Sequence, residues 1–149
     1  MKESVSYAVI GDIDSPATLT SAYSGNRLTL TDTHKFRGLQ LYGKFTPAVD
    51  NTQVFITVEA DMDGSGNWFN LSVGDSASSD AEIGIGATGG VDGSDYGIPI
   101  AIPKTGGSSV TNTAIPIWWA TEKFAARQLR ISAKDSNGGT LYLGVTLFS

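Results

Sequence analysis

The sequence contains no cysteine, and it has a single histidine, His34, among 149 residues. Disulfide frameworks, thiolate nucleophiles and cysteine-ligated metal sites are therefore excluded, and so is a metal site built from several histidines. Any acid–base mechanism that uses histidine would depend on His34 alone. These absences remove many hydrolases and metalloenzymes and favour a binding or structural protein.

Positive charge is also scarce. Ten Lys and Arg stand against fifteen Asp and Glu, which gives a formal net charge of −5. Binding to nucleic acid without sequence preference needs clustered cations that displace counterions from phosphates. The sequence has no basic run, so we expect no nucleic-acid partner.

Long apolar runs are missing too. The longest lies near residues 114–120, far short of the roughly 18 residues that identify a membrane span. The apolar stretch behind the N-terminus is too short for a secretory signal. We therefore expect no membrane partner and no signal peptide, and a soluble protein that is made in a cytoplasm.

Eighteen Gly and five Pro are spread along the chain, which favours many short elements joined by turns. In residues 53–60, apolar residues alternate with mostly polar ones, which is the period of a half-buried strand. The same period recurs in residues 128–134 and 140–148. Further strands, rich in β-branched or aromatic residues, are expected at 5–10, 17–20, 27–31, 36–45, 68–73, 98–102 and 114–119.

About 8 to 10 strands in one domain predict an all-β fold, a single antiparallel β-sandwich of jelly-roll type over residues 1–149. Asp135–Gly139 has the composition of a tight turn, so we expect the last two strands to form a hairpin. One short helix is expected at Thr121–Arg127, capped by Thr121. Gly74–Gly97 is rich in Gly, Ser and Asp, and we expect it to be a long excursion from the domain, either functional or disordered.

Residues 61–67 (Asp-Met-Asp-Gly-Ser-Gly-Asn) have the composition of a calcium loop, because Ca²⁺ prefers many oxygen ligands around a curved backbone. However, position twelve counted from Asp61 is Ser72, where an EF-hand has glutamate, and both flanks have strand patterns. We therefore favour a hairpin turn with Asp63-Gly64 at its tip and expect no metal ion. A bound cation is the alternative.

No catalytic constellation is distinguished by the sequence. His34 and Asp32 lie in a polar turn between two strands, which is typical of an exposed histidine and not of a tuned acid–base group. Gly84–Gly89 fits Gly-x-Gly-x-x-Gly, but no helix pattern follows it, so we expect a flexible loop without a phosphate. We expect no catalytic residue and no cofactor, and therefore a protein that is not an enzyme.

Trp118 and Trp119, together with Tyr96, are candidates for an aromatic platform on which sugar rings stack. Adjacent residues of a strand face opposite sides of the sheet, so only one of the two tryptophans can line a given surface. We favour one tryptophan in the core and the other under a loop or against a neighbouring subunit. A carbohydrate-binding module, or a tail or receptor-binding domain, is the alternative function.

Two segments resemble jelly-roll structural proteins of tailed bacteriophages, of the capsid decoration and head-fibre type. One runs from Val54–Ala60 through Asp63-Gly64 to Trp68–Leu71. The other is Phe124–Ile131, followed by a glycine-rich turn and Leu141–Leu147. Together they cover about half of the chain.

The resemblance implies a virion structural protein that is made in the host cytoplasm and carried in the virion. The most specific form of this expectation is a capsid decoration (cement) protein that binds the outer surface of a phage shell. Its partner would be the major capsid protein or another virion protein. By analogy with the three-fold positions of a shell, the resemblance implies a homotrimer.

Phe55, Tyr142 and Phe148 occupy positions that face outward on their strands. A second apolar surface of this kind is expected to be covered by a neighbouring subunit. Ile83 and Ile85, the apolar cluster of the glycine-rich segment, complete the candidate partner interface.

Overall fold

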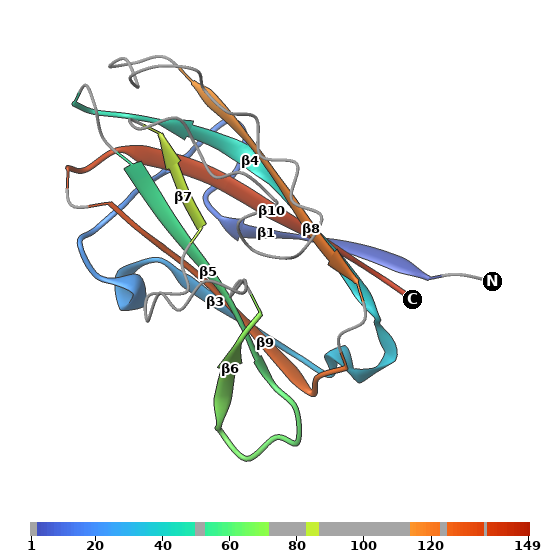
Figure 1. Ribbon diagram of the computed structural model, residues 1–149. Coiled ribbons are helices and arrows are strands. Elements are labelled where there is room, and N and C mark those ends of the chain that lie inside the picture. The colour runs from blue at the N-terminus through green and yellow to red at the C-terminus, as the bar shows by residue number, and fades with distance from the viewer. Residues whose placement is uncertain (1–2, 50–52, 72–82, 87–113, 123–124, 136) are drawn as a thin grey trace.

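The computed structural model describes residues 3–49, 53–71, 83–86, 114–122, 125–135 and 137–149. In these residues the chain forms two antiparallel sheets of five strands each and two short 3-10 turns (Figure 1). Sheet A consists of β1 (Ser4–Ile10), β2 (Ala17–Thr18), β4 (Gly38–Thr46), β8 (Ile115–Glu122) and β10 (Thr140–Phe148). Sheet B consists of β3 (Arg27–Thr31), β5 (Gln53–Asp61), β6 (Trp68–Asn70), β7 (Ile83–Gly86) and β9 (Gln128–Lys134). The 3-10 turns are η1 (Tyr23–Gly25) and η2 (Thr33–Lys35).

The order of the strands is β1-β10-β4-β8 in sheet A, with β2 also beside β10. In sheet B it is β3-β9-β5-β6, with β7 also beside β5. Strands from the beginning and the end of the chain therefore alternate within each sheet, which is the pattern of a jelly roll. The predicted antiparallel sandwich is confirmed.

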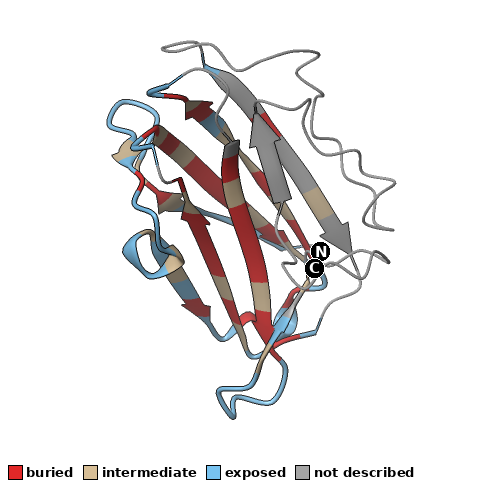
Figure 2. Cartoon of the chain, turned by 60° about the vertical axis from the view of Figure 1, so that its left-hand side comes forward, coloured by how far each residue is buried: buried red, intermediate tan, exposed pale blue. Residues whose placement is uncertain are grey.

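One hydrophobic core lies between the two sheets (Figure 2). Every second residue of β5, β9 and β10 is fully buried, and so are Leu39, Leu41 and Phe45 of β4. The strand period of the sequence thus places one apolar face of each sheet against the other. Full burial of a Leu, Ile or Phe contributes about 2 kcal/mol each, so this inner layer is the main source of the fold's stability.

The expected hairpin of the last two strands is wrong, because β9 belongs to sheet B and β10 to sheet A. The turn between them instead passes from one sheet to the other. Asp135, 2% exposed, stabilises it by accepting backbone N–H bonds from Asn137 (3.0 Å) and Gly139 (2.8 Å). Both edges of each strand are already paired, β9 with β3 and β5, and β10 with β1 and β4. No edge is left for β9 and β10 to pair with each other.

The helix expected at Thr121–Arg127 is also wrong. Its first two residues end strand β8, its last three are not helical, and residues 123–124 lie outside the described residues. Ala126, 2% exposed, instead accepts a hydrogen bond on its carbonyl from the Thr33 hydroxyl (2.8 Å). Such tertiary contacts outweigh the weak helix propensity of so short a segment.

The expected excursion at Gly74–Gly97 contains a strand. Within it, β7 pairs with β5, so this part of the segment is an element of sheet B. Its Ile-Gly-Ile-Gly sequence has the period of two that a strand requires. The rest of the segment, and the strand expected at 98–102, lie outside the described residues.

Candidate functional site

Of the residues considered for chemistry, His34 and Asp32 lie in one exposed turn. His34 is exposed in η2, as the turn pattern predicts. Asp32 precedes it in the left-handed region, with φ 56°. Within the described ranges, no three His, Asp or Glu side chains come close enough together to hold a metal ion.

The turn at residues 61–67 joins β5 to β6, which pair antiparallel from Asp61 opposite Trp68, so the hairpin prediction is confirmed. Gly64 and Gly66 both have positive φ. The fully buried carboxylate of Asp61 accepts N–H bonds from Gly64 (2.9 Å) and Gly66 (2.8 Å), one on each oxygen. Asp63 is exposed, and hydrogen bonds from Ser65 lower its pKa. Both oxygens of the buried carboxylate are therefore used by the turn's own backbone.

The structure separates the residues of the candidate partner interface. Tyr142 and Phe148 are half-buried on the outer face of sheet A, because the alternate residues of β10 fill the core. Phe55 is half-buried on the outer face of sheet B, between the buried Val54 and Ile56. The two outer faces lie on opposite sides of the core, so these aromatic residues do not form one surface.

Ile83 and Ile85 lie on neither of these outer faces. They are the register partners of Ile56 and Val54, which are fully buried. By register, positions 83 and 85 belong to the inner side of sheet B, whereas Phe55 belongs to its outer side. The single interface expected from the sequence is therefore divided, because alternate residues of paired strands face opposite sides.

The outer face of sheet B is covered by its own cationic side chains. Arg130 donates to both carboxylate oxygens of Glu59, at 2.8 Å each, and its guanidinium lies 4.3 Å from the centre of the Trp68 ring. The hydrogen bonds to Glu59 raise the pKa of Arg130. Farther along the same face, the Lys134 ammonium lies 5.7 Å from the centre of the Phe55 ring. These cation–π contacts occupy the aromatic rings of this face.

On the outer face of sheet A, aromatic rings lie over glycines of the neighbouring strand. The Tyr42 ring lies over Gly144, where an added Cβ would come within 2.6 Å of it, and Phe148 lies over Gly38 in the same way. Both are directly opposed cross-strand pairs of β4 and β10. Tyr142 meets Tyr42 edge-on, with ring centres 6.3 Å apart. Desolvation raises the pKa of Tyr142, and its neighbour Tyr42 raises it further.

The candidate sugar platform is only partly described. Trp118 is the register partner of Tyr42, and Trp119 is the partner of the buried Leu41. The two positions therefore belong to opposite faces of sheet A, as the strand period predicts. Tyr96 lies outside the described residues. Sequence reasoning missed Tyr42, although it alternates with buried leucines in an expected strand; only the register shows that it lies beside Tyr142.

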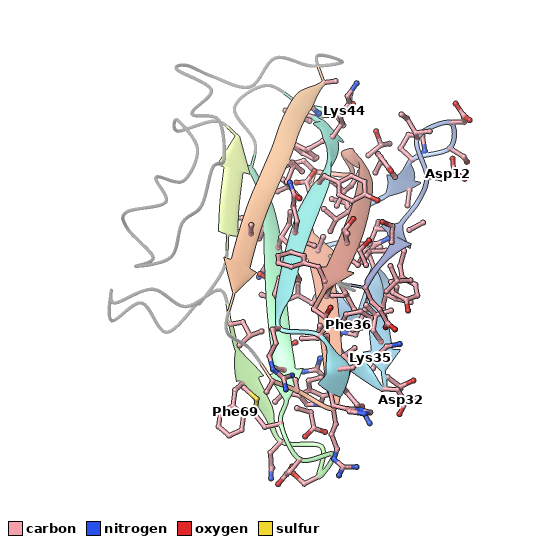
Figure 3. All side chains as sticks on the ribbon, turned by 90° about the vertical axis from the view of Figure 1, so that its right-hand side faces the viewer. Asp12, Asp32, Lys35, Phe36, Lys44 and Phe69 are labelled. Carbon is pink, nitrogen blue, oxygen red and sulfur yellow. The ribbon has the colours of Figure 1, made fainter. Side chains whose placement is uncertain are left out.

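A groove of about 700 Å³ lies beside β1. We call it the β1 groove; its lining residues are Glu3, Ser4, Val5, Tyr7, Thr31, Asp32, Lys35 and Phe36. Lys35 forms an exposed ion pair with Glu3 (3.1 Å) and lies 5.2 Å from the centre of the Phe36 ring. Figure 3 shows Asp32, Lys35 and Phe36 together at the end of the sandwich away from Asp12 and Lys44.

No family model matches the sequence, and a search of curated proteins also found no match. No helix in the described parts of the chain has the length and apolar character needed to cross a membrane. The class that the fold defines is an all-β sandwich with the strand order of a jelly roll.

Solved structures with similar folds include the SPBc2 prophage-derived protein YomS, at 12% identity and TM-score 0.44, over 100% of this chain and 96% of that one. The CBM22-1 xylan-binding domain of Paenibacillus barcinonensis Xyn10C also has 12% identity and TM-score 0.44, over 99% and 83% of the two chains. The infectious bursal disease virus VP2 subviral particle has 9% identity and TM-score 0.39, over 99% and 33%. Similarity at this level assigns no function.

Proposed function

We propose that this chain is a non-enzymatic virion structural protein of a tailed bacteriophage. It self-associates and binds the outer surface of the shell as a capsid decoration protein, with the outer face of sheet A as its attachment surface. The observation that carries the proposal is the contrast between the two outer faces. Arg130 and Lys134 lie over aromatic rings of sheet B, whereas among the described residues no cation lies over Tyr42, Tyr142 or Phe148.

The composition of the sheet A face suits docking onto a broad protein surface. It carries the aromatic Tyr42, Tyr142 and Phe148 over the small Gly38 and Gly144, with Lys44 directly opposite Tyr142, and aromatic residues are enriched at the centres of protein interfaces. Because Tyr42 and Phe148 already lie over glycines, binding would order few additional side chains. When few side chains lose conformational freedom on binding, more of the free energy gained by burying surface remains as binding free energy.

Shells that lack this protein provide the test. Tyr142→Ala removes one half-buried ring from the sheet A face, and Phe55→Ala is the matched control on sheet B. We expect Tyr142→Ala to weaken binding in co-sedimentation at least tenfold, which is about 1.4 kcal/mol, and Phe55→Ala to bind as the unaltered protein does. Thermal melting checks that both variants fold. Loss of binding by Phe55→Ala alone would assign attachment to sheet B and contradict the proposal.

Carbohydrate binding is the second candidate function, favoured by one arrangement. Tyr142, Tyr42 and position 118 occupy neighbouring positions on three adjacent strands, β10, β4 and β8. Aromatic side chains combine an apolar ring with a polar group, which suits a sugar ring.

A glycan array distinguishes the two candidates. A specific signal that Tyr42→Ala or Trp118→Ala abolishes, in variants that remain folded, favours the carbohydrate-binding module. A negative array together with co-sedimentation on empty shells favours decoration.

A further inference from the structure

Strand β1 is an edge strand whose outer side has no strand partner among the described residues. In sheet A it pairs only with β10. An unpaired edge presents a row of backbone N–H and C=O groups that can pair with another chain. Proteins usually protect such edges with charge, proline or short length.

The other edge strands carry charge or proline or are very short, whereas β1 has only an irregularity in its pairing with β10, between Ala8 and Ile10. Pro116 and Glu122 lie in β8, and β3 begins with Arg27. The remaining edge strands, β2, β6 and β7, have two, three and four residues. In contrast, β1 has seven residues, Ser-Val-Ser-Tyr-Ala-Val-Ile, with neither charge nor proline. It is therefore the edge best suited to accept another strand.

The β1 groove runs beside this edge. Val5 and Tyr7 line it from β1, while Thr31 lines it from the end of β3 and Phe36 from the position after η2. Of these residues, Tyr7 is 38% exposed, whereas Phe36 is 4% exposed. The edge thus offers backbone pairing beside a groove in which Val5, Tyr7 and Phe36 lie among polar and charged residues.

We propose that β1 pairs antiparallel with β1 of a second copy of this chain, about a two-fold axis at Tyr7, so that the two A sheets form one continuous sheet. This interface goes beyond the proposed function, which requires self-association but does not define its geometry. It also differs from the three-fold association that the sequence resemblance implies.

The sequence of β1 indicates a second copy as the occupant, because it is nearly symmetric in chemistry about Tyr7. An antiparallel pairing centred there places Val5 opposite Val9 of the second copy, and Ser6 opposite its Ala8. Apolar Val5 and Val9 therefore meet on one side, and small Ser6 and Ala8 meet on the other, which is favourable for directly opposed pairs. Ile10 is 4% exposed and lies beyond the irregularity of β1, so the pairing is confined to residues 5–9. No charge is brought opposite a like charge. A two-fold contact of this kind is self-complementary and closes at two copies.

The same pairing fills the β1 groove. Tyr7 of the second copy would lie opposite Tyr7, and Val9 of the second copy opposite Val5, both on the groove side of the strand. A pairing over residues 5–9 is at the lower limit of stable interface size. We therefore expect a dimer that dissociates on dilution.

Charge substitutions on the axis test this geometry. Tyr7→Lys and Tyr7→Glu each place like charges opposite each other in a two-fold dimer, so each variant alone should be monomeric by light scattering after size-exclusion chromatography. An equimolar mixture should recover the dimer, because opposite charges then face each other. Thr29→Lys, on an exposed position of β3, is the control and should dimerise like the unaltered protein.

Because the chain has no cysteine, a single introduced cysteine gives a second test. Tyr7→Cys should form a disulfide-linked dimer under mild oxidation, since directly opposed residues of antiparallel strands have Cα atoms about 4.5–5.5 Å apart. Thr29→Cys should stay monomeric on the same non-reducing gel.

Three results would overturn the proposal: an unaltered protein that is monomeric at every concentration, a trimer mass, or Tyr7 variants whose mass does not change. Failure of the β1 dimer can be told apart from failure of the proposed shell attachment, because folded Tyr7→Lys monomers retain the sheet A face around Tyr142. They would still bind empty shells if that face attaches the protein.

Discussion

Two buried aspartates stabilise turns of this sandwich from inside. Asp61 and Asp135 are 0% and 2% exposed, and each accepts two backbone N–H bonds from the turn that follows it. Burying a carboxylate costs less free energy when backbone N–H groups bond to it. Removing the carboxylate leaves those N–H groups without their acceptor. These two side chains therefore specify the conformation of the turns that they begin.

We predict that Asp61→Ala lowers the free energy of unfolding by about 2 kcal/mol, because two loop N–H groups lose their acceptor. Asp63→Ala is the matched control on the same turn. Its carboxylate is exposed, so we expect a much smaller change in the free energy of unfolding than for Asp61→Ala. Urea denaturation measures both. Equal effects of the two substitutions would show that the buried carboxylate is not what stabilises the turn.

Single residues differ in how far the sequence predicts their roles. The turn at Asp61 follows from local composition, because glycines at positive φ and an aspartate that bonds nearby N–H groups act within a few residues. The position of Tyr42 beside Tyr142 depends on the pairing of β4 with β10, which are far apart in sequence. No local pattern contains that register, so the candidate site could not be assembled from the sequence.

At the scale of elements, β4 and β10 are joined by aromatic rings that lie across glycines of the opposite strand. We predict that Gly144→Val destabilises the protein by about 1–3 kcal/mol, although valine is the better strand former. The reason is that its Cβ would come within 2.6 Å of the Tyr42 ring. Thr146→Val, two residues along the same face, is the control and should cost less than about 1 kcal/mol.

A double-mutant cycle assigns the cause of that cost. In a Tyr42→Ala background the ring is absent, so Gly144→Val should lose most of its destabilising effect. Chemical denaturation of the four proteins gives the interaction energy. If the two effects simply add, the clash is not with Tyr42.

The element order shows where periodicity stops being informative. The alternation in β9 and β10 correctly predicts two strands with one buried face each. It does not show whether consecutive strands pair side by side or face each other across the core, since both arrangements bury the same residues. Here β9 and β10 each already have a strand on both edges, so the turn at Asp135–Gly139 passes between the sheets.

At the scale of the whole molecule, both sheets contribute to one hydrophobic cluster, so they should unfold together. Leu143 in β10 and Leu129 in β9 are both fully buried, one in each sheet. We predict that Leu143→Ala and Leu129→Ala each lower the free energy of unfolding by about 2–5 kcal/mol, with coincident transitions by circular dichroism and tryptophan fluorescence. Thr29→Ala, on the exposed side of β3, is the control and should leave the midpoint nearly unchanged. Two separate transitions, of which each leucine variant shifts only one, would mean that the sheets are independent units and that the core between them does not couple their folding.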